Sequence, residues 1–251
     1  MNSNNVIVVQ SGKVSSQNLG TEFANINISL VSDGLEIHVP ENTVVNTPLI
    51  FIHDGDKTAS FTVHIKIDAY GVLNVSQIVI GDGSLDLDCL VALVGSGASS
   101  EVKTVAVASG EQKTNIQTKI ENLAPHTVAN IVNHGVVKDD ARLAFDGVGK
   151  IHKGMNGSDA QQETRLLNLS LNAKAIANPF LLIDEGDITA GHAASIGRID
   201  EEQIYYLMSR GMKKPDAEKL IVSGFLVPFI DGIDDEEVKE ALALKIEAKL
   251  D

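Results

Sequence analysis

The stretch FTVHIKID, residues 61–68, carries the clearest structural signal in the chain. Apolar side chains at Phe61, Val63, Ile65 and Ile67 alternate with polar ones. Successive side chains of a β-strand project to opposite faces, so a period of two predicts a strand with one buried face.

Similar runs recur from the N-terminal region to about residue 198, separated by turn-prone segments. The runs lie at 26–30, 35–39, 49–52, 72–80, 85–94, 102–107 and 127–132, and the turn signals at 32–34, 54–56, 81–83 and 95–97. Many short strands with regular turns predict a sandwich, a barrel or a β-solenoid. Periodicity does not choose among the three. With no strict repeat visible, the pattern alone favours a sandwich, the commonest of them.

The chain changes character after residue 198, which divides it into a β domain (1–198) and a helical subdomain (199–251). Asp200 and Gln203 form a capping-box pattern, and Gly211 stands where a first helix would end. Pro215 suits the first turn of a second helix. Gly224 is expected to stop that helix, and a second capping box at 234–237 predicts a third.

The composition excludes several function classes. A net charge of −14 over 251 residues leaves no basic footprint for nucleic acid or for an anionic membrane. Cys89 is the only cysteine, so an intrachain disulfide is impossible and one chain cannot supply a four-thiolate site. No signal peptide and no run of about 18 apolar residues is visible, so we expect a cytoplasmic protein.

Motifs for catalysis are weak. Gly147-Val148-Gly149-Lys150 lacks the earlier glycine and the following Ser or Thr of a phosphate loop, and turn glycines explain it better. No G-x-S-x-G elbow supports a catalytic triad. His126, His134 and His152 fall in a region that reads as loop-rich, without metal-ligand spacing. His192, among small residues where strands give way to helices, is by spacing alone more consistent with a histidine bonded to the backbone.

Residues 190–230 read AGHAASIGRIDEEQIYYLMSRGMKKPDAEKLIVSGFLVPFI. This segment resembles the C-terminal signature of the SufB/SufD family of iron–sulfur cluster assembly scaffolds. Its elements are a His among small residues, an acidic pair before a Gln, an aromatic pair, Ser209-Arg210-Gly211, and a helix ending in Gly-Phe. Upstream, DAQQETRLLNLS (159–170) and residues 178–187 also match. The specific resemblance covers residues 158–230.

The resemblance implies a right-handed parallel β-helix with a small C-terminal helical subdomain, in place of the sandwich. It implies that the terminal helices dock SufC, an ABC-type ATPase. The residues that match the docking region are Tyr205, Tyr206, Leu207, Arg210, Gly211 and Phe225. It also implies that His192 lies at the interface with a SufB-like sister subunit or a second copy, as a ligand of a transient Fe–S cluster that this chain does not bind stably alone.

The match is nearer to SufD than to SufB, because SufB subunits carry a glutamate after the corresponding histidine and this chain carries Ala193. No cysteine lies between the Gln–Arg segment and His192, so Cys89 is expected to be a buried, inert thiol. Family members are typically longer, with an N-terminal helical region that this sequence does not match.

The resemblance predicts a non-enzymatic scaffold, and two alternatives remain beside it. One is a β-helical enzyme acting on acidic sugars, for which Asp54, Asp56, Asp82 and Asp86 are candidate carboxylates, although turns also use Asp for geometry alone. The other is a structural adaptor without metal contact. It differs from the scaffold only in the role of His192.

Overall fold

The computed structural model describes residues 7–10, 13–14, 27–31, 34–230, 233 and 236–250. These residues form β-strands followed by three α-helices. The helices are α1 (Glu201–Ser209), α2 (Lys214–Ile230) and α3 (Glu236–Leu250). The strands are β1 (Ile7–Gln10), β2 (Lys13–Val14), β3 (Asn27–Val31), β4 (Gly34–Val39), β5 (Val44–Ile52), β6 (Ala59–Ile67), β7 (Val72–Ile80), β8 (Leu85–Leu93), β9 (Ser99–Ala108), β10 (Lys113–Asn122), β11 (Val128–Val137), β12 (Arg142–Ile151), β13 (Ser158–Asn168), β14 (Lys174–Ile183) and β15 (Ile188–Gly197).

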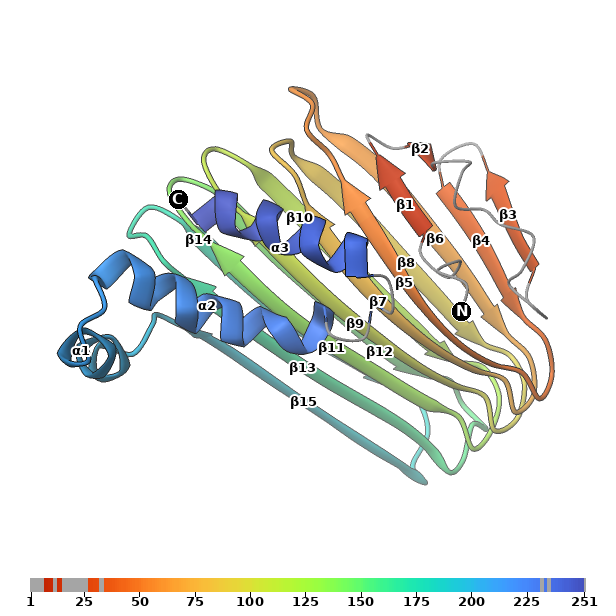
Figure 1. Ribbon diagram of the computed structural model, residues 1–251. Coiled ribbons are helices and arrows are strands. Elements are labelled where there is room, and N and C mark those ends of the chain that lie inside the picture. The colour runs from red at the N-terminus through yellow and green to blue at the C-terminus, as the bar shows by residue number, and fades with distance from the viewer. Residues whose placement is uncertain are drawn as a thin grey trace.

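The strands form two sheets, which we call sheet A and sheet B. Sheet A has the order β15-β13-β11-β9-β7-β5-β1-β2, and sheet B has the order β14-β12-β10-β8-β6-β4-β3. From β4 onward each strand pairs in parallel with the next strand but one, so the chain winds through about six turns of a β-solenoid (Figure 1). The β-helix implied by the family resemblance is confirmed. The sandwich favoured by the pattern alone is wrong, because strands pair between successive coils.

The coils differ in length, which explains why the sequence shows no strict repeat. Ala59 on β6 lies opposite Leu85, 26 residues later, whereas Arg142 on β12 lies opposite Lys174, 32 residues later. The additional residues lie in the turns. The strands therefore stay aligned, although the number of residues between aligned positions changes from one coil to the next.

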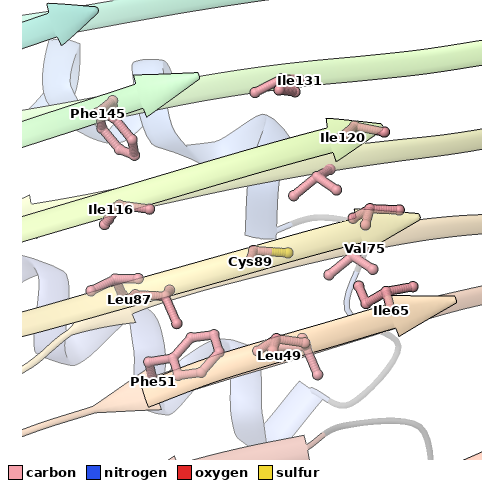
Figure 2. Packing of buried hydrophobic residues seen from close by; sticks show 14 of the residues in the cluster. Leu49, Phe51, Ile65, Val75, Leu87, Cys89, Ile116, Ile120, Ile131 and Phe145 are labelled. Carbon is pink, nitrogen blue, oxygen red and sulfur yellow. The ribbon is translucent and has the colours of Figure 1, made fainter. Parts of the chain in front are cut away.

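The main hydrophobic core lies between the two sheets and is filled mostly by Val, Ile, Leu and Ala. Figure 2 shows Cys89 among Leu49, Val75 and Ile120 in this core. The cysteine is fully buried, and burial raises the pKa of its thiol to about 12. The expectation of a buried thiol is therefore confirmed.

A second core lies on the outer face of sheet A, where α2 and α3 cover the sheet (Figure 1). Val222, Leu226 and Phe229 of α2, with Leu242 and Ile246 of α3, pack against the strands. The sheet contributes Ile50, Ile78, Ile80, Val105, Val107 and Val136. The helices therefore share a core with the solenoid.

The helix signals are confirmed in part. Asp200 is the N-cap of α1 and accepts a hydrogen bond of 2.8 Å from the backbone of Glu202, and Pro215 lies in the first turn of α2. The predicted stop at Gly224 is wrong, because α2 continues to Ile230. Burial of Leu226 and Phe229 outweighs the roughly 1 kcal/mol that a helical glycine costs. The predicted capping residue Asp234 lies outside the described residues.

Two other local predictions are corrected. Gly147 and Gly149 lie inside β12 rather than in a turn, and His134 lies inside β11 rather than in a loop. Among the described helices, none is long and apolar enough to cross a membrane.

Candidate functional site

The C-terminal end of the solenoid is open. Strands β14 and β15 are the last strands of sheets B and A, and no described strand pairs with their outer edges. Residues that would be buried in an inner coil are exposed here, so this end presents unpaired backbone groups and apolar side chains together. Such an edge is a template for strand addition by another chain.

His192 lies in this open end, on β15. It is aligned with Gln162 on β13, and aligned residues of parallel strands project to the same face. The Gln162 amide crosses the space between the sheets and donates to the carbonyl oxygen of Phe180, 2.9 Å away. His192 therefore projects from the inner face of sheet A, where it is exposed because no further coil covers it.

The residues that share the inner face of β15 with His192 are apolar: Ala190, Ala194 and Ile196. On strand β14 of the other sheet, Phe180 and Leu182 lie on the outer face, directed away from His192. Phe180 and Leu182 are each 48% exposed and Ile196 is 50% exposed. The sequence reading did not single these residues out, although the run PFLLI without alternation was a signal that both faces of this strand are apolar.

Among the described residues, no three His, Cys, Asp or Glu side chains gather, at His192 or elsewhere, in a way that could hold a metal ion. A complete ligand set at His192 would therefore need side chains from another molecule.

A second exposed surface lies on α1, which projects beyond the sheets (Figure 1). Tyr205 is 76% exposed and Tyr206 is 57% exposed, whereas Ile204 of the same helix is buried. The Arg210 guanidinium lies 5.2 Å from the centre of the Tyr206 ring, a cation–π contact that keeps this ring in place. We call Tyr205, Tyr206, Leu207, Met208 and Arg210 the α1 surface.

A hollow of about 440 Å³ separates α1 from α2. Tyr206 and Leu207 line it from α1, and Leu220 and Ile221 line it from α2. Gly211, with a φ of +97°, ends α1 beside this surface. Exposed aromatic rings around an apolar hollow are typical of the central residues of protein interfaces.

Phe225, the remaining residue expected at the docking surface, lies elsewhere. Its ring stacks on the His134 imidazole, with the ring centres 4.4 Å apart and the planes at 9°, and Phe229 contacts the same imidazole. The Phe225 carbonyl oxygen lies 3.3 Å from His134 Nδ1. Half-buried, Phe225 therefore holds α2 on sheet A and is separate from the α1 surface.

The carboxylates considered for a sugar-cleaving enzyme mostly have structural partners. Lys245 and Lys249 of α3 bind Asp54 and Asp82 at 3.4 and 3.0 Å, and the Asn115 amide donates to Asp86 at 2.6 Å. These contacts attach α3 to the turns of the solenoid and align neighbouring strands.

Comparison with known proteins gives the family. Residues 1–225 match the domain described as "SUF system FeS cluster assembly, SufBD core domain". The chain belongs to the SufBD core family. The match spans the β region as well as residues 158–225 of the segment on which the sequence resemblance was based.

Curated SufBD proteins agree with this assignment. The chain is 34% identical over 289 aligned residues to "Iron-sulfur cluster assembly protein SufD" of Bacillus subtilis, covering 90% of this chain and 66% of that protein. It is 30% identical over 206 residues to an "Iron-sulfur cluster assembly SufBD family protein" of Mycobacterium tuberculosis, covering 78% of this chain and 52% of that protein. The chain thus spans less than two thirds of the length of these relatives. The SufD-like character expected from Ala193 is confirmed.

Proposed function

We propose that this chain is a SufD-like scaffold subunit of cytoplasmic iron–sulfur cluster assembly and has no catalytic activity of its own. It docks a SufC-type ABC ATPase through the α1 surface, and a SufB-type subunit or a second copy through the open end of the solenoid. The observation that carries the proposal is the open end itself, where unpaired strand edges, exposed apolar side chains and one imidazole lie together in a member of the SufBD core family.

The position of α1 supports a lever mechanism. Strand β15 ends at Gly197 and α1 begins at Glu201, so three residues connect the docking surface to the edge strand that carries His192. Helices α2 and α3 are fixed to the outer face of sheet A. Movement of the ATPase is thus applied to the last coil, while the rest of the solenoid stays rigid.

In this mechanism nucleotide binding favours one of two arrangements of the subunit interface. The ATPase shifts the equilibrium only by its difference in affinity for the two arrangements. Opening of the interface admits iron and sulfide, which are the cargo. His192 supplies one imidazole ligand, and the partner subunit supplies the others.

The ATPase contact is tested by binding a purified SufC-type ATPase to the full chain and to the double variant Tyr205→Ser/Tyr206→Ser. Removing two exposed interface tyrosines is expected to weaken binding at least about tenfold and to abolish stimulation of ATP hydrolysis. Tyr70→Ser is the matched control, because Tyr70 is also exposed but lies in a solenoid turn. Equal binding by the double variant and the control would refute the α1 contact.

Point variants are needed here because deletion of residues after Gly197 would uncover the second core. Ile78, Val105 and Val136 of sheet A would lose the helices that shield them. A loss of binding by such a truncation would then report misfolding as readily as a lost contact.

The subunit contact is tested by Phe180→Asp/Leu182→Asp, with association measured by sedimentation for the chain alone and with a SufB-type subunit. The charges are expected to abolish association, since both side chains lie exposed on the edge strand. Leu171→Asp, in the turn before β14 and 84% exposed, is expected to associate normally. Unchanged association of the double variant would mean that the open end is not the interface.

The role of His192 is tested in the assembled complex. His192→Ala is expected to lower the yield of reconstituted cluster, measured by visible absorbance under anaerobic conditions, while His64→Ala, an exposed histidine of β6, leaves it unchanged. Full cluster yield with His192→Ala would favour the structural adaptor instead.

A further inference from the structure

A row of polar side chains runs through the apolar core between the sheets. On sheet A the strand registers place Gln77, Thr104, Asn133 and Thr164 next to one another on β7, β9, β11 and β13. Their neighbours two positions away, Val75 and Val79 on β7 for example, belong to the core between the sheets, so the row faces inward. All four side chains are buried.

Two further polar side chains project into the same core, one from each sheet. Thr118 lies on β10 of sheet B, next to Cys89 on β8 and between the core residues Ile116 and Ile120. Gln162 lies on β13, beside Thr164. Both are at least nine-tenths buried. We call these six residues, from Gln77 to Gln162, the interior polar seam.

The seam satisfies only part of its own hydrogen-bonding capacity. Thr104 donates to Gln77 Oε1 at 3.0 Å, Asn133 Nδ2 donates to Thr164 at 3.2 Å, and Gln162 Nε2 donates to the Phe180 carbonyl. Four atoms in the seam have no partner in the described part of the chain: Gln77 Nε2, Thr118 Oγ1, Asn133 Oδ1 and Gln162 Oε1.

These unpaired atoms are too costly to leave in a dry core. Each would destabilise the fold, because the lost hydration of the atom would not be replaced by a hydrogen bond. Exchanging the oxygen and nitrogen of the Gln77 amide does not remove the problem, because the other amide atom is then unpaired. Buried polar atoms without a protein partner are the sites at which internal water binds.

The seam also leads to solvent. Gln162 is aligned with His192 and Thr164 with Ala194 on the exposed strand β15. Gly147 and Gly149 leave the space that the Gln162 amide occupies, since a Cβ atom at Gly147 would lie 2.8 Å from Gln162 Oε1. At the other end Gln77 is followed by Leu49 and Cys89 by Val63, so that end is closed by apolar side chains.

We propose that the interior polar seam binds a file of water molecules that runs from Cys89 to the open end of the solenoid beside His192. The waters accept from Gln77 Nε2, donate to Asn133 Oδ1 and Gln162 Oε1, and pair with the Thr118 hydroxyl. The proposal concerns the isolated chain and does not depend on the ATPase or on a partner subunit.

The direct test is a crystal structure of the chain at a resolution that shows ordered water. Water molecules are expected within hydrogen-bond distance of all four unpaired atoms. A seam without water density, with the four atoms paired to one another by altered rotamers, would overturn the proposal.

A stability measurement tests the same point in solution, because the two possibilities predict opposite signs. Thr118→Val keeps the shape of the side chain and removes its hydroxyl. If the hydroxyl binds water, the urea midpoint falls, since that water loses a partner. If the seam is dry, the midpoint rises because an unpaired buried hydroxyl is gone. Thr189→Val on the exposed strand β15 is the control and is expected to leave the midpoint unchanged. A raised or unchanged midpoint for Thr118→Val would overturn the proposal.

Discussion

His134 joins the solenoid to α2, and its protonation state matters for that contact. Burial beneath the helix lowers the pKa of the imidazole from its ordinary 6.5, although the hydrogen bond with the Phe225 carbonyl opposes the change. Two charged groups of the neighbouring strand act on it, Arg165 lowering and Glu163 raising the pKa. The neutral ring is therefore the form that stacks on Phe225.

This arrangement predicts a loss of stability in mild acid. Because the pKa is lower in the folded than in the unfolded chain, the stability contributed by neutral His134 is complete above pH 6.5 and declines as the pH falls below it. Urea midpoints measured between pH 8 and pH 5 are expected to fall for the wild type and to fall less for His134→Gln. His64→Gln, which changes an exposed ring, should follow the wild type. If both variants fall in parallel with the wild type, the titrating group is not His134.

Lys249 is a buried cation that fastens α3 to the turns of the solenoid. Its ammonium group lies 2.7 Å from Gln112 Oε1, 3.0 Å from Asp82 and 3.3 Å from Ser109, and its side chain is only 6% exposed. Lys249→Met keeps the apolar stem and removes these contacts, with an expected loss of about 1–3 kcal/mol in unfolding free energy. Lys245→Met, whose partner Asp54 is exposed, is expected to cost less than about 1 kcal/mol. Equal losses in denaturant titrations would show that burial does not strengthen the Lys249 contacts.

The sequence predicted single residues where a local rule was sufficient. Asp200 was found because a capping residue acts on its own first turn. Cys89 was expected to be a buried thiol because it lies far upstream of the position at which the family resemblance would place a cluster cysteine. Phe225 was grouped with the docking residues because it lies in the segment that resembles the family's docking region. Its contact with His134 joins residues 91 positions apart, and no local pattern reports such a contact.

The turns of the solenoid repeat one backbone conformation. Asn42, Tyr70, Gly97, His126 and Gly157 all have a positive φ and occupy corresponding positions in successive coils. The backbone N–H of each donates to a carbonyl in the next coil, as from Tyr70 to Ser96 and from His126 to Asn156. This column of bonds holds neighbouring turns together at one side of the sheets.

Gly154 and Gly186 allow the energetic cost of backbone strain to be measured separately from the cost of side-chain packing. Gly154 has a φ of +88° and Gly186 does not have a positive φ, yet an added Cβ atom would meet nothing within 4 Å at either position. Gly154→Ala is therefore expected to cost about 1–2 kcal/mol through the left-handed conformation alone, and Gly186→Ala almost nothing. Thermal or urea unfolding of both variants measures the difference. Equal stabilities would mean that the turn relaxes to a negative φ.

Strands with strong alternation could be predicted, and strands with polar inner faces could not. Strand β6 was recognised because Phe61, Val63, Ile65 and Ile67 are all apolar. Strand β10 was not, because Thr114, Thr118 and Asn122 occupy inward positions that most sheets fill with apolar residues. These three buried polar residues, of which Thr118 belongs to the interior polar seam, break the apolar alternation by which the strand could have been recognised.

The solenoid as a whole should be unevenly stable. Strands β7, β9 and β11 are covered on one face by the main core and on the other by α2 and α3, whereas β15 is covered by no further coil. In a linear stack of coils, the free energy of unfolding is approximately the sum of each coil's own stability and of its interfaces with neighbouring coils. The terminal coil has only one such interface, so it opens most readily. Amide hydrogen exchange is expected to be slowest in β9 and fastest among the long strands in β15.

The same measurement connects stability to assembly. Exchange in β15 is expected to slow when a SufB-type subunit or a high concentration of the chain is present, while β9 is unaffected. Rapid exchange in β15 under all of these conditions would argue against pairing at the open end. Uniform exchange along the solenoid would contradict the uneven stability.

The parallel coil itself required more than periodicity. Alternation shows that a strand has two faces, and it contains no information on which strand lies beside it. Because the coils vary in length from 26 to 32 residues, the sequence has no constant period by which a solenoid could be identified. Only the family resemblance gave the correct topology.

The unequal coils also constrain how such a chain can change in evolution. A residue inserted in a turn, for example between Ile151 and Ser158, lengthens one coil and leaves every strand facing as before. A residue inserted within a strand sends all later side chains of that strand to the opposite face. Insertions and deletions among descendants of this sequence should therefore collect in the turns, and each coil can acquire its own loop while the stack beneath it is inherited intact.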